Sequence, residues 1–156
     1  MTDLYDADAL EWSEHQARLL RQHAAGQAGN EAPDWANIIE EIESVGRSEL
    51  HTVRSNLVQA LIHDLKCEAW PLASYVPHWR AEARVFRGNA ADSFTPFMRQ
   101  RIDVDALYRR ALRGLPETMD GLLPLLLPAA CEATLDQMLH AEADLPAIED
   151  QGTCRE

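Results

Sequence analysis

The chain has 156 residues, 46% of them apolar, which is enough for one domain whose core needs neither a metal nor a disulfide. Its formal net charge of −12 disfavours a nucleic-acid backbone or an anionic lipid surface as a partner. The first residues carry no secretory signal, the longest apolar run is interrupted by prolines, and the cysteines are widely spaced. These features predict a cytoplasmic protein without a membrane span.

Helical periodicity begins near the start of the chain. Residues 6–25 predict a first helix, with Asp6 or Asp8 as its N-cap. Asp34 is the expected N-cap of a long second helix that reaches about Trp70, where the following proline stops it. The core stripe of this helix recurs every three or four residues: Trp35, Ile39, Ile42, Gly46, Leu50, Val53 and Leu57. The glycine in the stripe indicates close approach by another backbone, or a kink.

Two shorter helical segments are predicted next. A third helix is expected from residue 74 or 77 to residue 87, with Gly88 and Asn89 as its C-cap. A fourth segment extends over about residues 93–113 and is expected to break near Asp103.

The remaining chain is divided by prolines. Residues 122–127 are too apolar to be left in water, so they cover the core or contact another chain. A last helix is expected over residues 132–143, and residues 146–156 are expected to form a flexible tail. Strand patterns are nearly absent. The sequence therefore predicts an all-α fold, a single-domain bundle of five or six helices over residues 1–145 around the long central helix.

One string in the long helix is specific enough to identify a family. Residues 40–48 read Glu-Glu-Ile-Glu-Ser-Val-Gly-Arg-Ser, and other matching residues include Trp12, Trp35, His63, Pro71, Trp79, Arg80, Arg84, Arg87 and Pro128. With these residues the chain resembles the bacterial family catalogued as domain of unknown function twenty-nine, whose members are uncharacterised. The resemblance implies an all-α domain and nothing about activity. The chain departs from the pattern at Asp64, where leucine is expected, and at Cys67, where tryptophan is expected.

The polar residues of the string form a candidate site. Glu40, Glu43, Arg47 and His51 share one arc, because helical spacings of three and four residues return to the same face. Two carboxylates and an imidazole suit a divalent metal or acid–base chemistry. The preferred interpretation is structural: an ion pair between Glu43 and Arg47, and a carboxylate bonded to a neighbouring helix. The Glu-x-x-His pairs typical of metal sites in helical bundles do not occur in the sequence.

Histidine also occurs in two other sets of residues that could bind a metal. His63 lies where the long helix is apolar almost all round, one turn before Cys67. We interpret it as a hydrogen-bonded core or interhelical residue rather than a ligand of a soft metal. Glu132, Asp136 and His140 recur at a spacing of four residues, which indicates an exposed acidic face or, as the alternative, a metal-binding face.

Arginine is concentrated between residues 78 and 113, which hold eight arginines against four acids. The simplest explanation is pairing with the acidic N-terminal part of the chain. Arg80, Arg84 and Arg87 share a helix face, however, and arginine forks suit carboxylates and phosphates. The alternative is therefore a site in which these arginines bind an anionic ligand or an acidic partner segment, and in which the Trp79 ring forms a wall that stacks against it.

No catalytic or cofactor-binding signature is recognisable: zincin, P-loop, dinucleotide-binding and nucleophile-elbow strings are all missing from the sequence. The preferred function is a non-enzymatic protein-interaction or regulatory module without metal or cofactor, with homodimerisation as one mode. The alternative is a metal-assisted hydrolase or nuclease-like enzyme that uses Glu40, Glu43 and His63 on an anionic substrate. On a straight helix His63 projects roughly 140 to 160° away from these glutamates, which disfavours the enzyme.

Overall fold

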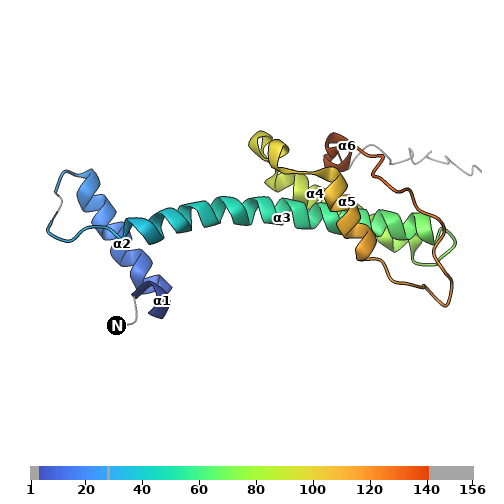
Figure 1. Ribbon diagram of the computed structural model, residues 1–156, viewed down its shortest axis with the longest axis horizontal. Coiled ribbons are helices and arrows are strands. Elements are labelled where there is room, and N and C mark those ends of the chain that lie inside the picture. Colours follow the sequence, from blue (N-terminus) through green and yellow to red (C-terminus); the bar gives the residue numbers. More distant parts are fainter. Residues whose placement is uncertain (1–3, 28, 141–156) are drawn as a thin grey trace, which may run out of the picture. The chain divides into compact units, whose positions relative to one another are not determined.

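The computed structural model describes residues 4–27 and 29–140 of the chain. Within these ranges six α-helices and one 3₁₀ helix form, and there is no strand, which confirms the predicted all-α fold. The long central helix predicted from Asp34 to Trp70 is α3, Trp35–Ala69 (Figure 1). None of the described helices is both long enough and apolar enough to cross a membrane.

The chain divides into two compact units, residues 1–48 and residues 49–156, and the boundary falls within α3. The single domain expected over residues 1–145 remains a prediction. The expected flexible tail, residues 146–156, lies outside the described residues.

The first unit contains α1, Leu4–Ala7, α2, Ala9–Ala24, and the first part of α3. The predicted first helix is split at Asp8, whose side chain accepts hydrogen bonds from the N–H groups of Leu10 and Glu11 at 3.1 and 3.0 Å. These bonds satisfy N–H groups that a helix start leaves without partners.

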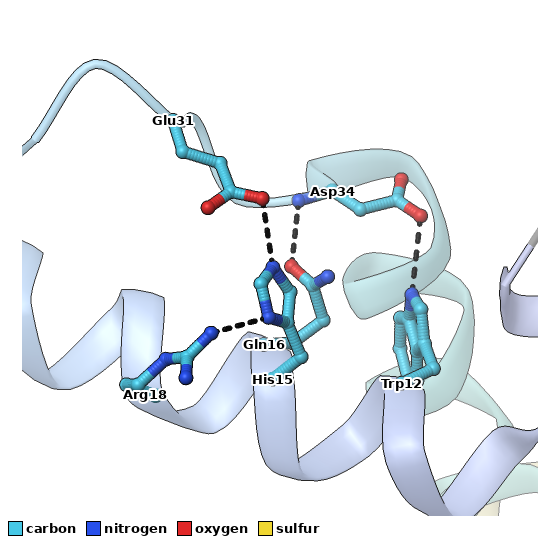
Figure 2. Close-up of polar contacts among 6 residues, drawn as sticks. All are labelled: Trp12, His15, Gln16, Arg18, Glu31 and Asp34. Atoms are coloured by element: carbon cyan, nitrogen blue, oxygen red, sulfur yellow. Dashed lines mark hydrogen bonds and ion pairs between the residues drawn. The ribbon is translucent and has the colours of Figure 1, made fainter.

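The start of α3 is fixed against α2 through Asp34 (Figure 2). The N–H of Asp34 donates to Oε1 of the buried Gln16 at 2.9 Å, and Trp12 Nε1–H donates to the Asp34 carboxylate at 3.3 Å. The same carboxylate accepts bonds from the side chain and the N–H of Asn37 at 2.6 and 3.4 Å, so Asp34 caps α3 as predicted. These bonds, led by the one from the Asn37 side chain, lower the pKa of Asp34.

The second unit surrounds the remaining part of α3, where Val53 and Leu57 are 0% exposed. Its other elements are α4, Val76–Ser93, η1, Pro96–Arg101, α5, Val104–Arg113, and α6, Leu135–Leu139 (Figure 1). Buried side chains of α3, α4, α5 and α6, and of Ile102 between η1 and α5, form one core: Val53, Leu57, Val58, Leu61, Leu65, Ala90, Ile102, Leu107, Tyr108, Ala111, Leu135, Met138 and Leu139.

Two predicted helix boundaries are wrong. The C-cap predicted at Gly88 does not form, and α4 continues to Ser93. Continuing the helix places Ala90, which is fully buried, in the core of the second unit. The last helix was expected from residue 132 but begins at Leu135, because Thr134 forms a capping box with Gln137. The expected part of that helix beyond residue 140 lies outside the described residues.

The break predicted near Asp103 is confirmed, since the 3₁₀ helix ends at Arg101 and α5 begins at Val104. The Asp103 side chain caps α5 by accepting a hydrogen bond from the N–H of Ala106 at 3.0 Å.

The apolar stripe of α3 is buried only in its later part, so the prediction of a continuous core stripe is wrong for its first turns. Trp35, Ile39 and Ile42 are 47%, 54% and 68% exposed. The buried residue of these turns is the neighbouring Ile38. The close backbone approach expected at Gly46 is also not found, because an added Cβ would meet no heavy atom within 4 Å in the described part of the chain.

The leucine-rich segment between α5 and α6 is attached to the end of α3 through main-chain groups. Trp70 Nε1–H donates to the carbonyl of Leu122 at 3.0 Å, and the N–H of Leu125 donates to the carbonyl of Ala69 at 2.9 Å. Leu127 packs against the core, as expected. The other leucines of the segment are exposed: Leu122, Leu123, Leu125 and Leu126.

Gly88 tests the continuation of α4. Gly88→Ala is expected to raise the free energy of unfolding by about 0.5–1 kcal/mol, because alanine is the better residue in a helix interior. The added Cβ would meet nothing within 4 Å in the described part of the chain. Urea denaturation followed by circular dichroism measures the change.

Gly121→Ala is the matched control, since Gly121 has a φ of +77° that strains any L side chain. It is expected to lower the free energy of unfolding by about 1 kcal/mol. If Gly88→Ala destabilised the protein as Gly121→Ala does, a helix through Gly88 would be contradicted.

Candidate functional site

The family string places a charged cluster on the surface of the first unit. Arg47 bonds Glu40 at 2.5 Å and Glu43 at 3.4 Å, and all three side chains are more than half exposed. The ion pair predicted between Glu43 and Arg47 is therefore present, but it is exposed to solvent. Exposed pairs of this kind contribute only about 0–1 kcal/mol to stability.

A different carboxylate of the string bonds to a neighbouring helix. Tyr5 of α1 donates its hydroxyl hydrogen to Glu41 Oε1 at 2.6 Å, and this bond raises the pKa of Tyr5. Sequence reasoning selected Glu40 and Glu43 by their spacing to Arg47 and passed over Glu41. The tyrosine is 36 residues away in sequence, so no local spacing signals the contact.

His63 belongs to the second unit, where its ring stacks on Phe86 with 5.7 Å between the ring centroids. The hydrogen bond expected for this ring is missing at Nδ1, which is buried and has no partner among the described residues. Burial is also the main cause that lowers the pKa of His63. Glu40 and Glu43 lie in the other unit, and nowhere in residues 4–27 and 29–140 do three or more His, Cys, Asp or Glu side chains group as metal ligands would.

The arginine row of α4 lines a groove of about 890 Å³ in the second unit. We call it the arginine groove. One wall is formed by Arg80, Arg84 and Arg87, and the opposite wall comes from the segment around α6. The other lining residues are Leu61, Asp64, Glu132, Ala133, Asp136, Gln137, Met138 and His140.

Trp79 does not line this groove, so the predicted stacking wall is wrong. It is buried in a separate cluster with Ala69, Trp70 and Val76. Neighbouring residues on a helix project about 100° apart, so the side chain that precedes Arg80 turns toward the core.

Among the lining residues Arg87 forms an ion pair with Asp64, and both side chains are about three-quarters buried. Burial raises the pKa of Asp64 to about 6, although the Arg87 charge acts in the opposite direction. Sequence reasoning set Asp64 aside as a departure from the family pattern. Its partner lies 23 residues later on another helix, which spacing alone does not reveal.

The opposite wall contains the group predicted from its spacing of four residues. Only Asp136 of this group lies in α6, although Glu132 and His140 also line the groove. Asp136 receives two hydrogen bonds from Arg99 at 2.7 and 3.1 Å, which lower its pKa. The pairs with Asp64 and Asp136 occupy two arginines of the 78–113 segment with acids of their own unit, not with the acidic N-terminal part.

Glu43→Gln tests how much the string's charged cluster contributes to stability. Because the pair with Arg47 is exposed, we expect the free energy of unfolding to change by less than about 0.5 kcal/mol in urea denaturation. A loss of several kcal/mol would show that the cluster is buried in the protein's working state.

The raised pKa of Asp64 gives a pH dependence with a defined sign. The folded pKa of about 6 exceeds the ordinary 3.8, so between these values the folded state holds a proton that the unfolded state has released. The free energy of unfolding therefore rises as the pH falls through 6. Between pH 7.5 and 5 we expect Asp64 to add about 1.4 kcal/mol.

Urea denaturation of the wild-type protein and of Asp64→Asn at both pH values isolates this contribution. The wild-type protein should gain stability relative to the variant at the lower pH. Asp92→Asn, at an exposed position of α4, is the control and should follow the wild-type protein. Equal pH dependence in Asp64→Asn and the wild-type protein would refute the assignment.

The fold is similar to that of an α-helical protein of unknown function from Rhodospirillum rubrum ATCC 11170, known from a crystal structure at 1.45 Å resolution. The two chains share 24% sequence identity with a TM-score of 0.59, over 92% of this chain and 94% of the other. No curated protein matches the sequence. The family resemblance of the string is confirmed over almost the whole chain: the protein belongs to the family described as domain of unknown function DUF29, whose pattern matches residues 4–143.

Proposed function

We propose that this protein is a non-enzymatic, cytoplasmic protein-interaction module that forms a homodimer through the first turns of α3. The observation that supports this proposal is an apolar helix face that the described part of the chain leaves largely exposed, although the ring of His23 lies edge-on to Trp35 with 5.8 Å between the ring centroids. The face consists of Trp35, Ile39 and Ile42, which are about half or more exposed, together with Gly46. We call these four residues the open α3 face.

The spacing of the open α3 face suits a second helix. Steps of four, three and four residues from Trp35 to Gly46 keep the face within a narrow arc, as in the seam of a coiled coil. Gly46 carries no side chain that would hold a crossing helix away, and the described chain brings nothing near it. A glycine costs about 1 kcal/mol in a helix interior, so close approach by another chain gives it a role.

A second copy is the favoured partner because it supplies the same face. Homodimers with twofold symmetry pair one patch with itself, and they are the commonest soluble oligomers. Beside the apolar residues lie Glu40, Glu43 and Arg47, which provide the polar rim found around most interfaces.

The expected affinity is moderate. Burying the exposed parts of Trp35, Ile39 and Ile42 from two chains is worth roughly 5–10 kcal/mol, at 1.5–3 kcal/mol for each fully buried side chain. Association costs roughly 4–15 kcal/mol in lost freedom of motion. The two terms are similar in size, so we expect a reversible dimer rather than an obligate one.

The metal-assisted enzyme has less support. Glu40 and Glu43 are already bonded to Arg47 on an exposed surface, and His63 is stacked on Phe86 in the second unit. Glu40, Glu43 and His63 line neither the arginine groove nor the groove that adjoins it in the second unit.

Light scattering after size-exclusion chromatography tests the homodimer. The wild-type protein is expected to shift from one chain to two as its concentration rises through the micromolar range. Ile42→Glu should remain a single chain, because a charge would be buried without a partner. Val85→Glu changes an apolar residue of α4 that is also more than half exposed, and it should behave as the wild-type protein.

Gly46→Leu separates folding from association. Leucine is a better helix former than glycine, so the isolated chain should be at least as stable while the added side chain blocks a crossing helix. A wild-type protein that stays a single chain at every concentration would overturn the homodimer, as would an Ile42→Glu variant that still associates.

A further inference from the structure

We infer that the arginine groove binds a small anion with two carboxylate or phosphate groups, held by Arg80 and Arg84. This site lies in the second unit and is separate from the open α3 face, so it does not depend on the proposed homodimer.

The two arginines are spaced for such a ligand. They lie four positions apart on α4, which corresponds to a rise of about 6 Å along the helix. Each guanidinium offers paired N–H donors that match the oxygens of a carboxylate or phosphate. Neither arginine forms an ion pair within the described ranges.

The remaining charges of the groove are mostly neutralised in pairs. Arg87 is bonded to Asp64, and Asp136 is bonded to Arg99. Within this groove Arg80 and Arg84 are then opposed by Glu132, which has no ion pair among the described residues, while Glu68 lines an adjoining groove together with Arg80. A local excess of positive charge in a chain of net charge −12 favours a specific site, since the protein as a whole repels anions.

The size and the floor of the groove fit a small molecule. Its volume of about 890 Å³ falls within the 300–1,000 Å³ typical of ligand pockets. Leu61 and Met138, both buried, also line it.

Glu132 defines the competing explanation. A movement of its side chain across the groove could neutralise Arg80 or Arg84 within the protein, and the groove would then bind no anion. In that case the wild-type protein would bind no anion and only Glu132→Gln would, whereas in a true site the wild-type protein binds and Glu132→Gln strengthens the binding by removing a repelling charge.

Isothermal titration calorimetry at constant ionic strength tests the site with citrate, pyrophosphate and inorganic phosphate as probes. We expect saturable binding of one citrate or pyrophosphate per chain, and weaker binding of inorganic phosphate, because it has one phosphate group and cannot contact both arginines with separate groups. Preference between citrate and pyrophosphate distinguishes a carboxylate ligand from a phosphate ligand.

Arg80→Gln and Arg84→Gln are each expected to weaken this binding at least tenfold, the loss of a charge-assisted hydrogen bond. Arg110→Gln, an exposed arginine of α5 outside the groove, is the control and should bind as the wild-type protein. Circular dichroism verifies that each variant is folded. No saturable binding of any probe to the wild-type protein, or an equal loss in Arg110→Gln, would overturn the proposal.

Discussion

The burial of Val53 and Leu57 in α3 is the constraint on which the second unit depends. Both side chains are fully excluded from water, and the other members of their core come from α3, α4, α5 and α6 and from Ile102, between η1 and α5. Because protein interiors are closely packed, the position of each of these elements is coupled to the others. The coupling reaches the arginine groove: Ala90 and Met138 belong to this core, and they lie on the helices that carry its two walls.

The starts of α3 and α5 were predictable, whereas the end of α4 and the burial along α3 were not. Asp34 caps α3 as predicted, and Asp103 caps α5 at the predicted break, because an N-cap needs only a side-chain oxygen beside the first free N–H groups. At Gly88 the local signal for a C-cap is overridden by burial of Ala90 two residues later. Periodicity identified the apolar stripe of α3, but only the fold shows that Ile42 has no covering partner in the described chain, whereas Leu57 does.

The candidate site was also predictable only in part. Spacing alone placed Arg80, Arg84 and Arg87 on one face, and they line one wall of the groove. Spacing could not supply the other wall, since the segment around α6 reaches it only through tertiary packing. It also could not show that Asp64 pairs with Arg87, or that His63 lacks a bond at Nδ1 among the described residues. Contacts between residues that are distant in the chain do not produce a periodic pattern in the sequence.

The attachment of the leucine segment to α3 has a consequence for protein engineering. Both of its hydrogen bonds to Ala69 and Trp70 use main-chain atoms of the segment, the carbonyl of Leu122 and the N–H of Leu125. The path of the segment therefore does not depend on its exposed leucine side chains. Foreign recognition sequences could replace those side chains and be displayed at a defined position, which makes this loop a natural graft site on the scaffold.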